Sequence, residues 1–266
     1  MPCGYSRLMT SSVSFETKCY EGDWKLVASE PYLRRVIAGC RYHFDHRVLY
    51  LNNFADYGPA IEAAERLVAT NTVDEYCVVE EHAAEALKFF GLTKDSLTVG
   101  YNYSIAELVG IFRCKSRYLL HFSGDSQMAD KAPAWVGDAI DLMETKSDVL
   151  VANPVWNGRY RQARREALAE DGNWYYSYGF SDQCYLVKAA SLQNHGVLSE
   201  THPASDRYPA YGGELFEKRV DAYMRNHNLH RITSKHASYV HKTQAKVGSL
   251  QRLKRRRAQK SLRPKA

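Results

Sequence analysis

The sequence predicts an α/β fold with a mostly parallel central sheet. Short β-rich runs alternate with segments of helical hydrophobic spacing between residues 12 and 122. Such alternation is typical of parallel sheets, because two parallel strands need a long crossover and a helix usually supplies it. The 266 residues are 45% hydrophobic, which is enough for one large domain. We therefore expect a single domain.

In the N-terminal half, each predicted strand leads into a predicted helix. Leu33 and Val36 share one face of the first helix, Pro59 stands in the first turn of the second, and Gly91 ends the third. Ser104 is the predicted cap of the fourth helix. The predicted strands are 12–18, 47–54, 75–79, 97–100 and 118–122. The predicted helices are 24–40, 59–69, 81–90 and 104–114.

The C-terminal half has fewer regular elements. Phe216, Val220 and Met224 share one face of its last predicted helix. The aromatic stretch 174–180 has neither a helical nor a strand period, so we expect a loop there. The predicted helices of this half are 133–145 and 214–227, and the predicted strands are 148–153, 183–188 and 237–241.

The charge of the chain is concentrated at its C-terminal end. The formal net charge is +6, and the basic segment 246–266 exceeds that value alone. A solvated, flexible tail is the preferred interpretation, and contact with an anionic membrane surface is an alternative. Binding of nucleic acid is a weaker alternative.

The cysteines and the N-terminus favour a cytoplasmic protein. The six cysteines show neither a CxxC pair nor zinc-like spacing. The first 15 residues are too polar for a signal peptide, and no apolar run approaches the ~20 residues that cross a bilayer. Any membrane contact is expected to be peripheral, at the inner face.

Polar residues cluster where the predicted strands end. In parallel α/β sheets, ligands bind beyond the carboxyl ends of the strands, where loops and helix N-termini meet. The residues at these positions are Cys19, Tyr20, Glu21, Asn52, Asn53, Tyr101, Asn102, Gly124, Asp125 and Ser126.

Asp125 is the best single candidate for a metal ligand. It follows the predicted strand 118–122, and Gln127 lies two residues beyond it. Mg²⁺ takes oxygen ligands and needs only one or two carboxylates when phosphates supply the rest. His241, near the end of the last predicted strand, would suit Mn²⁺ as well. An ordinary Gly-Asp-Ser turn is the alternative.

Glu214 and Glu217 are the candidate catalytic bases. Both stand near the start of a predicted helix, where the dipole favours an ionised carboxylate, and two glycines precede them. A helix cap is the alternative for Glu214. The sequence does not decide between these two glutamates.

The aromatic stretch 174–180 is a candidate acceptor site. Flat rings beside polar groups suit the apolar faces and the hydroxyls of sugars, and Trp174, Tyr178 and Asp182 are the residues expected to contact them. A core position is the alternative for the aromatic side chains.

Between residues 12 and 241, the order of these motifs resembles the inverting glycosyltransferases of the GT-A fold, particularly the family 2 type. The loop Cys19-Tyr20-Glu21 resembles that family's nucleotide-binding opening, and Asp125 stands where its metal-binding aspartate motif lies. The segments FSDQCYLVKAASL and GGELFEKRVDAYMRNHNLHRI resemble its acceptor-side strand and acidic helix start. His241 stands where many members carry a late metal-binding histidine.

The resemblance implies a GT-A-like domain over 12–245, preceded by an extension at 1–11. Residues 12–128 would bind the nucleotide and residues 129–245 the acceptor. The implied enzyme is a hexosyltransferase that uses a UDP- or GDP-sugar, a saccharide or other hydroxyl acceptor, and Mn²⁺ or Mg²⁺. The metal would stabilise the leaving diphosphate while a carboxylate deprotonates the acceptor, which gives inversion.

Two positions depart from the family pattern. Gln127 stands where a second aspartate is usual, and Leu215 follows Glu214 where the family has an acidic pair.

Two other functions remain as alternatives. One is a sugar-nucleotide nucleotidyltransferase, which would ordinarily have an early glycine-rich basic loop, and the other is a noncatalytic protein that binds polyanions or nucleic acid through its basic tail.

Overall fold

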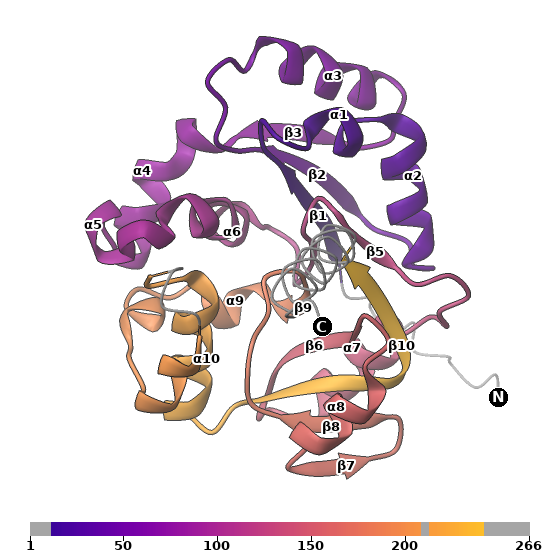
Figure 1. The fold of residues 1–266 in the computed structure, drawn as a ribbon, viewed down its shortest axis with the longest axis vertical. Coiled ribbons are helices and arrows are strands. Elements are labelled where there is room, and N and C mark those ends of the chain that lie inside the picture. The colour runs from indigo at the N-terminus through magenta and orange to yellow at the C-terminus, as the bar shows by residue number, and fades with distance from the viewer. Residues whose placement is uncertain (1–11, 209–212, 242–266) are drawn as a thin grey trace, which may run out of the picture.

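The computed structural model describes residues 12–208 and 213–241. The predicted extension 1–11 and the basic tail 246–266 lie outside these residues. The described chain forms one ten-stranded sheet with helices on both faces (Figure 1).

The strands and helices alternate along the chain as the sequence predicts. The strands are β1 (Val13–Cys19), β2 (His46–Leu51), β3 (Glu75–Val78), β4 (Tyr118–Phe122), β5 (Ser126–Met128), β6 (Val149–Trp156), β7 (Ala169–Asp171), β8 (Trp174–Ser177), β9 (Cys184–Lys188) and β10 (His230–His241). The longer helices are α2 (Glu30–Gly39), α3 (Gly58–Ala69), α4 (Val79–Phe90), α6 (Tyr101–Arg113), α7 (Val136–Thr145), α8 (Tyr160–Glu166) and α10 (Phe216–Asn226). Short helical turns are α1 (Trp24–Val27), α5 (Lys94–Leu97), η1 (Thr98–Gly100), α9 (Ala189–Leu192), η2 (Val197–Ser199) and η3 (Pro203–Arg207).

The strand order is β3-β2-β1-β4-β9-β6-β10-β8-β7, and β5 pairs with β10 outside this path. Strands β3, β2, β1 and β4 are mutually parallel, and β6 is parallel to β10. Strand β9 runs antiparallel to both β4 and β6, so these two strands point the same way. The predicted α/β class with a mostly parallel central sheet is therefore confirmed.

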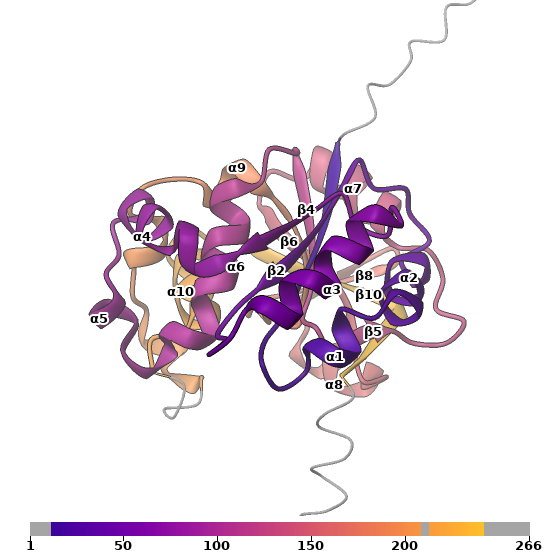
Figure 2. The same cartoon turned by 90° about the horizontal axis from the view of Figure 1, so that it is seen from above.

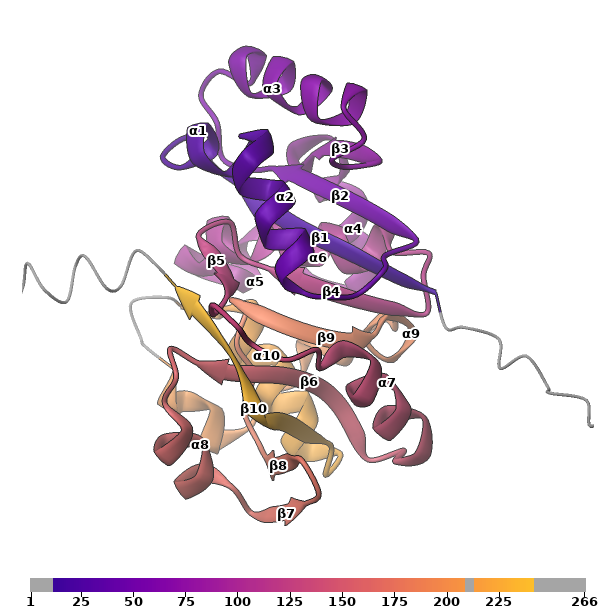
Figure 3. The ribbon, with the colours of Figure 1, turned by 90° about the vertical axis from the view of Figure 1, so that its right-hand side faces the viewer.

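Each face of the sheet carries its own hydrophobic core. Helices α2, α3 and α7 cover one face, and α4, α6 and α10 cover the other (Figure 2). Strand β10 runs across the middle of the C-terminal half and ends beside β5 (Figure 3). The carboxyl ends of β1, β2, β4 and β10 consequently meet at one edge of the sheet.

Three local predictions were wrong. Residues 97–100 form the end of α5 and the turn η1 instead of a strand. The predicted helix 24–40 is interrupted, because Pro31 lacks the N–H of a helix interior and stands in the first turn of a new helix, α2. Residues 174–177 form strand β8 within the sheet, because β10 pairs with them.

Ser104 also has a different role from the predicted one. It lies inside α6 and is fully buried. Its Oγ accepts a hydrogen bond of 2.9 Å from the N–H of Phe216, the first residue of α10. This contact satisfies one of the free N–H groups at the start of a helix that is distant in sequence.

Strand β1 has a polar face that is nevertheless buried. Ser14 and Glu16 are buried and Lys18 is half-buried, and α6 contacts Glu16 and Lys18 through Gly110 and Glu107. Gly110 of α6 allows this close approach, because a Cβ at that position would lie 2.4 Å from Oε2 of Glu16.

Gly110→Ala should lower the free energy of unfolding by about 1–3 kcal/mol, since the new methyl group would displace the buried Glu16 carboxyl from its contact with His121. Gly137→Ala in α7 is the matched control, because nothing lies within 4 Å of its Cβ position. That change should raise stability by up to about 1 kcal/mol. Urea unfolding measures the stability of both variants, and equal effects would contradict the close contact between Gly110 and Glu16.

Among the described residues, no helix combines the length and apolar composition needed to cross a membrane.

Candidate functional site

A cavity of about 670 Å³ opens at the carboxyl ends of β1, β2 and β4. We call it the strand-end cavity. Eight of the residues predicted from strand ends line it: Cys19, Tyr20, Asn52, Asn53, Asn102, Gly124, Asp125 and His241. Lys18, Asp23, Val99, Tyr103 and Ser123 complete its lining.

Asp125 and His241 meet in this cavity. Nε2 of His241 lies 2.8 Å from Oδ1 of Asp125. The antiparallel register of β5 with β10 places His241 opposite Ser126, directly beside Asp125. The pairing of two segments that are distant in sequence therefore creates the contact.

Asp23 adds a second carboxylate to the cavity. Burial, together with the charge of Asp125, raises its pKa to about 6. The two acidic groups are thus close enough to repel each other, although the N–H of Tyr20 donates a hydrogen bond of 2.9 Å to Asp23. A cation at this end of the cavity would relieve the repulsion.

The arrangement fits a divalent cation that takes further ligands from phosphate. Within 12–208 and 213–241, no group of three or more His, Cys, Asp or Glu side chains is arranged to hold a metal ion. Asp125 and His241 supply a carboxylate and an imidazole, and Nδ1 of His241 is buried without a protein partner. Mg²⁺ and Mn²⁺ sites commonly use one or two protein ligands together with substrate phosphates.

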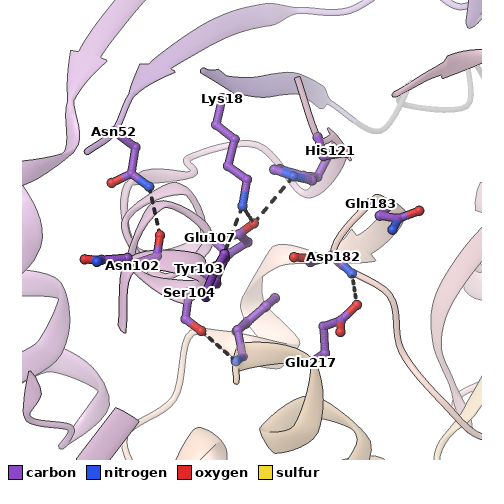
Figure 4. A network of polar contacts seen from close by, with 12 residues as sticks. Lys18, Asn52, Asn102, Tyr103, Ser104, Glu107, His121, Asp182, Gln183 and Glu217 are labelled. Carbon is purple, nitrogen blue, oxygen red and sulfur yellow. Dashed lines mark hydrogen bonds and ion pairs between the residues drawn. The ribbon is translucent and has the colours of Figure 1, made fainter. Parts of the chain in front are cut away.

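A network of buried ionisable groups lies beneath the cavity (Figure 4). Nζ of Lys18 forms an ion pair with Glu107 of α6, whose side chain is fully buried. Nε2 of His121 lies 3.8 Å from the same Glu107 oxygen, and Nδ1 of His121 lies 2.9 Å from Oε1 of Glu16. The network joins β1, β4 and α6.

Burial sets the protonation of this network. It lowers the pKa of His121 well below its usual value, with the charge of Lys18 acting in the same direction, so the imidazole is neutral at pH 7. It raises the pKa of Glu107 to about 6 even though Lys18 opposes the shift. Burial would lower the pKa of Lys18, but nearby carboxylates, Glu107 first, outweigh it and raise that pKa. Lys18 therefore remains a cation at the floor of the cavity.

Glu217 and Asp182 form an acidic pair next to Lys18 (Figure 4). The backbone N–H of Asp182 donates a hydrogen bond of 2.8 Å to Oε1 of Glu217. Burial, and then the charge of Asp182, raises the pKa of Glu217 well above its usual value. A carboxylate with a raised pKa is a more effective acceptor for the proton of a hydroxyl.

The two asparagines after β2 connect it to α6. Asn52 and Asn53 donate through their side-chain amides to the carbonyl oxygen of Asn102, at 3.3 Å and 2.8 Å. Asn53 has a φ of 57°, in the left-handed region that asparagine tolerates better than most residues. Both asparagines line the same cavity as Asp125 and can hydrogen-bond a polar ligand.

Four predicted residues lie near the cavity without lining it. Glu21 is exposed in the turn after β1, and Tyr101 is buried with Lys94 over its ring at 4.7 Å. Ser126 is buried, with its Oγ 2.8 Å from Oγ of Ser123. Gln127 lies in β5, with its Oε1 buried and without a protein partner.

Three further predicted residues lie away from the strand-end cavity. Trp174 is buried in β8, in the core on the face that α7 covers. Tyr178 stacks on His230 with ring centroids 5.3 Å apart, near the start of β10. Glu214 forms an ion pair of 2.8 Å with Lys218. The structure thus brings Glu217, and not Glu214, beside Asp182.

Sequence reasoning missed Lys18, Glu107 and His121. Alternating polar residues in the strand 12–18 were a signal, because a charged residue within a core strand needs a partner. That partner is in α6, whose burial the local sequence does not reveal. His121 stands inside an otherwise apolar run, which marks it as a buried polar group.

No protein-family model matches the sequence, and no curated protein sequence matches it. Solved structures resemble the chain. GalNAc-T7 with UDP, GalNAc and Mn²⁺ is 8% identical with a TM-score of 0.47, over 87% of this chain and 44% of that one. The galactosyltransferase LgtC with donor and acceptor sugar analogues is 11% identical with a TM-score of 0.43, over 79% and 70%.

Glucosyl-3-phosphoglycerate synthase from Mycobacterium tuberculosis, with Mn²⁺, UDP and glucosyl-3-phosphoglycerate, is 11% identical with a TM-score of 0.39. That likeness covers 80% of this chain and 68% of the synthase. The chain spans less than half the length of the GalNAc-T7 chain. The chemistry has to be argued from the site itself.

Proposed function

We propose that this protein is a metal-assisted glycosyltransferase of GT-A type. It transfers a sugar from a nucleotide-diphosphate sugar to a hydroxyl group of an acceptor, with inversion. The observation that carries the proposal is the strand-end cavity, which holds the Asp125–His241 pair and Lys18, with the acidic pair Glu217 and Asp182 directly behind Lys18.

The donor would bind with its diphosphate between Lys18 and Asp125. The cavity of about 670 Å³ lies within the range of small-molecule sites and can hold a nucleotide sugar. Asn52, Asn53 and Asn102 would hydrogen-bond the nucleoside. Lys18 would attract the phosphate oxygens as a point charge.

Asp125 and His241 would hold the divalent cation, Mn²⁺ or Mg²⁺, together with the diphosphate. When bound, the ion would stabilise the negative charge that develops on the leaving diphosphate. It would also offset the negative charge of Asp23 and Asp125, which otherwise repels an anionic donor. Lys18 would add a second, fixed positive charge on the same group.

Glu217 would act as the general base. It accepts the proton of the acceptor hydroxyl as that oxygen attacks the anomeric carbon of the donor sugar, and the bond to the diphosphate breaks on the opposite side. Asp182 raises the pKa of Glu217 and holds its carboxylate through the backbone N–H. Attack opposite the leaving group gives inversion.

Asp125→Asn should weaken the apparent affinity for Mn²⁺ in donor hydrolysis by about 10–100-fold, because one carboxylate ligand is lost. UDP- and GDP-sugars are screened with and without Mn²⁺, and product nucleotide is quantified. Asp130→Asn, an exposed aspartate in the segment after β5, is the matched control and should behave like wild type. A protein that neither hydrolyses nor binds any of these donors is not a glycosyltransferase of this kind.

The segment after β1 gives no support to the nucleotidyltransferase alternative. That activity would ordinarily need a glycine-rich basic loop to hold the phosphates. Residues 20–23 read Tyr-Glu-Gly-Asp, with a single glycine and two acidic side chains. The polyanion-binding alternative depends on residues 246–266, which lie outside the described chain.

A further inference from the structure

A second cavity, of about 300 Å³, lies between β6, β10 and α8. We call it the α8 cavity. Helix α8 packs against β6 and β8 (Figure 3). Its residues Gln162, Ala163 and Glu166 line one side of the cavity. Ser181 and Gln183, from the segment before β9, form the side that faces the rest of the site.

The α8 cavity adjoins the strand-end cavity through Gln183. The N–H of Ser123, which lines the strand-end cavity, donates a hydrogen bond of 2.9 Å to the carbonyl oxygen of Gln183. The hydroxyl of Tyr239, which lines the α8 cavity, lies 3.5 Å from Oε1 of Gln183. A residue of one cavity is therefore hydrogen-bonded directly to a residue of the other.

The acidic pair lies next to the segment that lines the α8 cavity, although neither carboxylate belongs to the lining of either cavity. Asp182 lies between Ser181 and Gln183 in the chain, and its N–H bonds to Glu217. Burial raises the pKa of Tyr239, and the charges of Asp182 and Glu217 raise it further. The same two carboxylates raise the pKa of Lys18 in the strand-end cavity. An acceptor in the α8 cavity would therefore lie next to the segment whose Asp182 N–H holds the proposed base.

The lining of the α8 cavity is basic and carries unused donors. Arg231 is 13% exposed, and its guanidinium donates to Oγ of Ser177 at 2.8 Å, while its Nε has no protein partner. The indole Nε1 of Trp156 is likewise buried without a protein partner. Arg159 stacks on the Trp156 ring at 4.1 Å. The lining has one carboxylate, Glu166, 3.8 Å from Arg231.

We propose that the α8 cavity is the acceptor subsite and that it takes one sugar residue carrying an anionic group, a carboxylate or a phosphate. This inference rests on the proposed function and adds the class of acceptor. A volume of about 300 Å³ is at the lower end for ligand sites, which suits one sugar residue. Guanidinium groups pair with carboxylate or phosphate, and a Trp ring packs on the apolar face of a sugar.

Binding of three probes tests the subsite without depending on transfer. Ligand-observed NMR compares glucuronic acid, glucose 6-phosphate and glucose on the full chain. We expect wild type to bind one or both acidic sugars at least about tenfold more tightly than glucose, as a charge-assisted hydrogen bond allows. Comparison of glucuronic acid with glucose 6-phosphate shows whether the site prefers a carboxylate or a phosphate.

Two variants assign the preference to this cavity. Arg231→Gln should remove most of the preference for acidic sugars, and Trp156→Phe, which keeps an aromatic ring but loses the indole N–H, should weaken binding several-fold. Arg161→Gln, an exposed arginine of α8 that does not line the cavity, should leave both the preference and the activity unchanged. Circular dichroism confirms that each variant is folded.

Equal binding of the three sugars by wild type, or a preference that persists in folded Arg231→Gln, would overturn the acceptor assignment. Donor hydrolysis by wild type without acceptor separates this outcome from failure of the proposed function. Donor hydrolysis without a preference for acidic sugars would reject only the proposed acceptor subsite. Acidic-sugar binding without any donor binding or hydrolysis rejects the transferase.

Discussion

Glu217→Gln is expected to lower the rate of sugar transfer by about 10²–10⁴-fold, the range typical of a lost general base. Glutamine has nearly the same shape and can still accept the N–H of Asp182, but it cannot take a proton from a hydroxyl. Donor binding should persist, since Glu217 does not line the strand-end cavity. The measurement is kcat for transfer together with Kd for the nucleotide diphosphate in Mn²⁺.

Glu214→Gln is the matched control for this prediction. Glu214 lies three residues earlier and pairs with Lys218, so its loss should change kcat by less than a few-fold. A large fall in kcat for Glu214→Gln with little change for Glu217→Gln would reverse the assignment of the base. Equal and large losses of donor binding would instead indicate damage to the fold.

The pH dependence follows from the raised pKa of Glu217. The base works only when ionised, so the rate should rise with pH through a pKa well above the ordinary value of 4.5. The stability effect has the opposite sign. A folded-state pKa above the unfolded one means that the folded protein holds the proton more tightly, so this contribution to stability falls as pH rises between the two values.

Glu107→Gln is expected to lower the free energy of unfolding by about 3 kcal/mol, near the lower end of the range for breaking a buried ion pair. The change leaves Lys18, 18% exposed, as a cation without its fully buried partner. Replacing both residues, as Lys18→Met with Glu107→Leu, should recover much of this loss, because two apolar side chains need no charge compensation. Urea unfolding of the single and double variants measures the effect.

The control for the loss of the Lys18–Glu107 ion pair is Glu30→Gln, which breaks the exposed ion pair between Glu30 and Arg34 on α2. These side chains are 42% and 49% exposed, so the cost should be below about 1 kcal/mol. The double variant at Lys18 and Glu107 should remain inactive even where its stability recovers, since it lacks the cation proposed for the diphosphate. A stable and fully active double variant would contradict that role.

Local sequence features predicted most of the elements and many of the residues at the sheet edge. Hydrophobic periodicity places β4 correctly at Tyr118–Phe122, and Gly91, with a φ of 67°, ends α4 as predicted. The strand-end rule indicated Asn52, Asn53 and Asp125, and all three line one cavity. Both kinds of prediction succeed because they depend on a few neighbouring residues and on the common direction of parallel strands.

The sequence alone thus determined the α/β class and the polar strand ends. Tertiary structure decided what meets there: the pairing of β5 with β10 brings His241 to Asp125, and α6 buries the polar face of β1 so that Glu107 meets Lys18. Tertiary structure also places Glu217 where it accepts the N–H of Asp182, whereas Glu214 forms an ion pair with Lys218. Periodicity reports which residues share a face, but the partner of that face depends on packing between segments far apart in the chain.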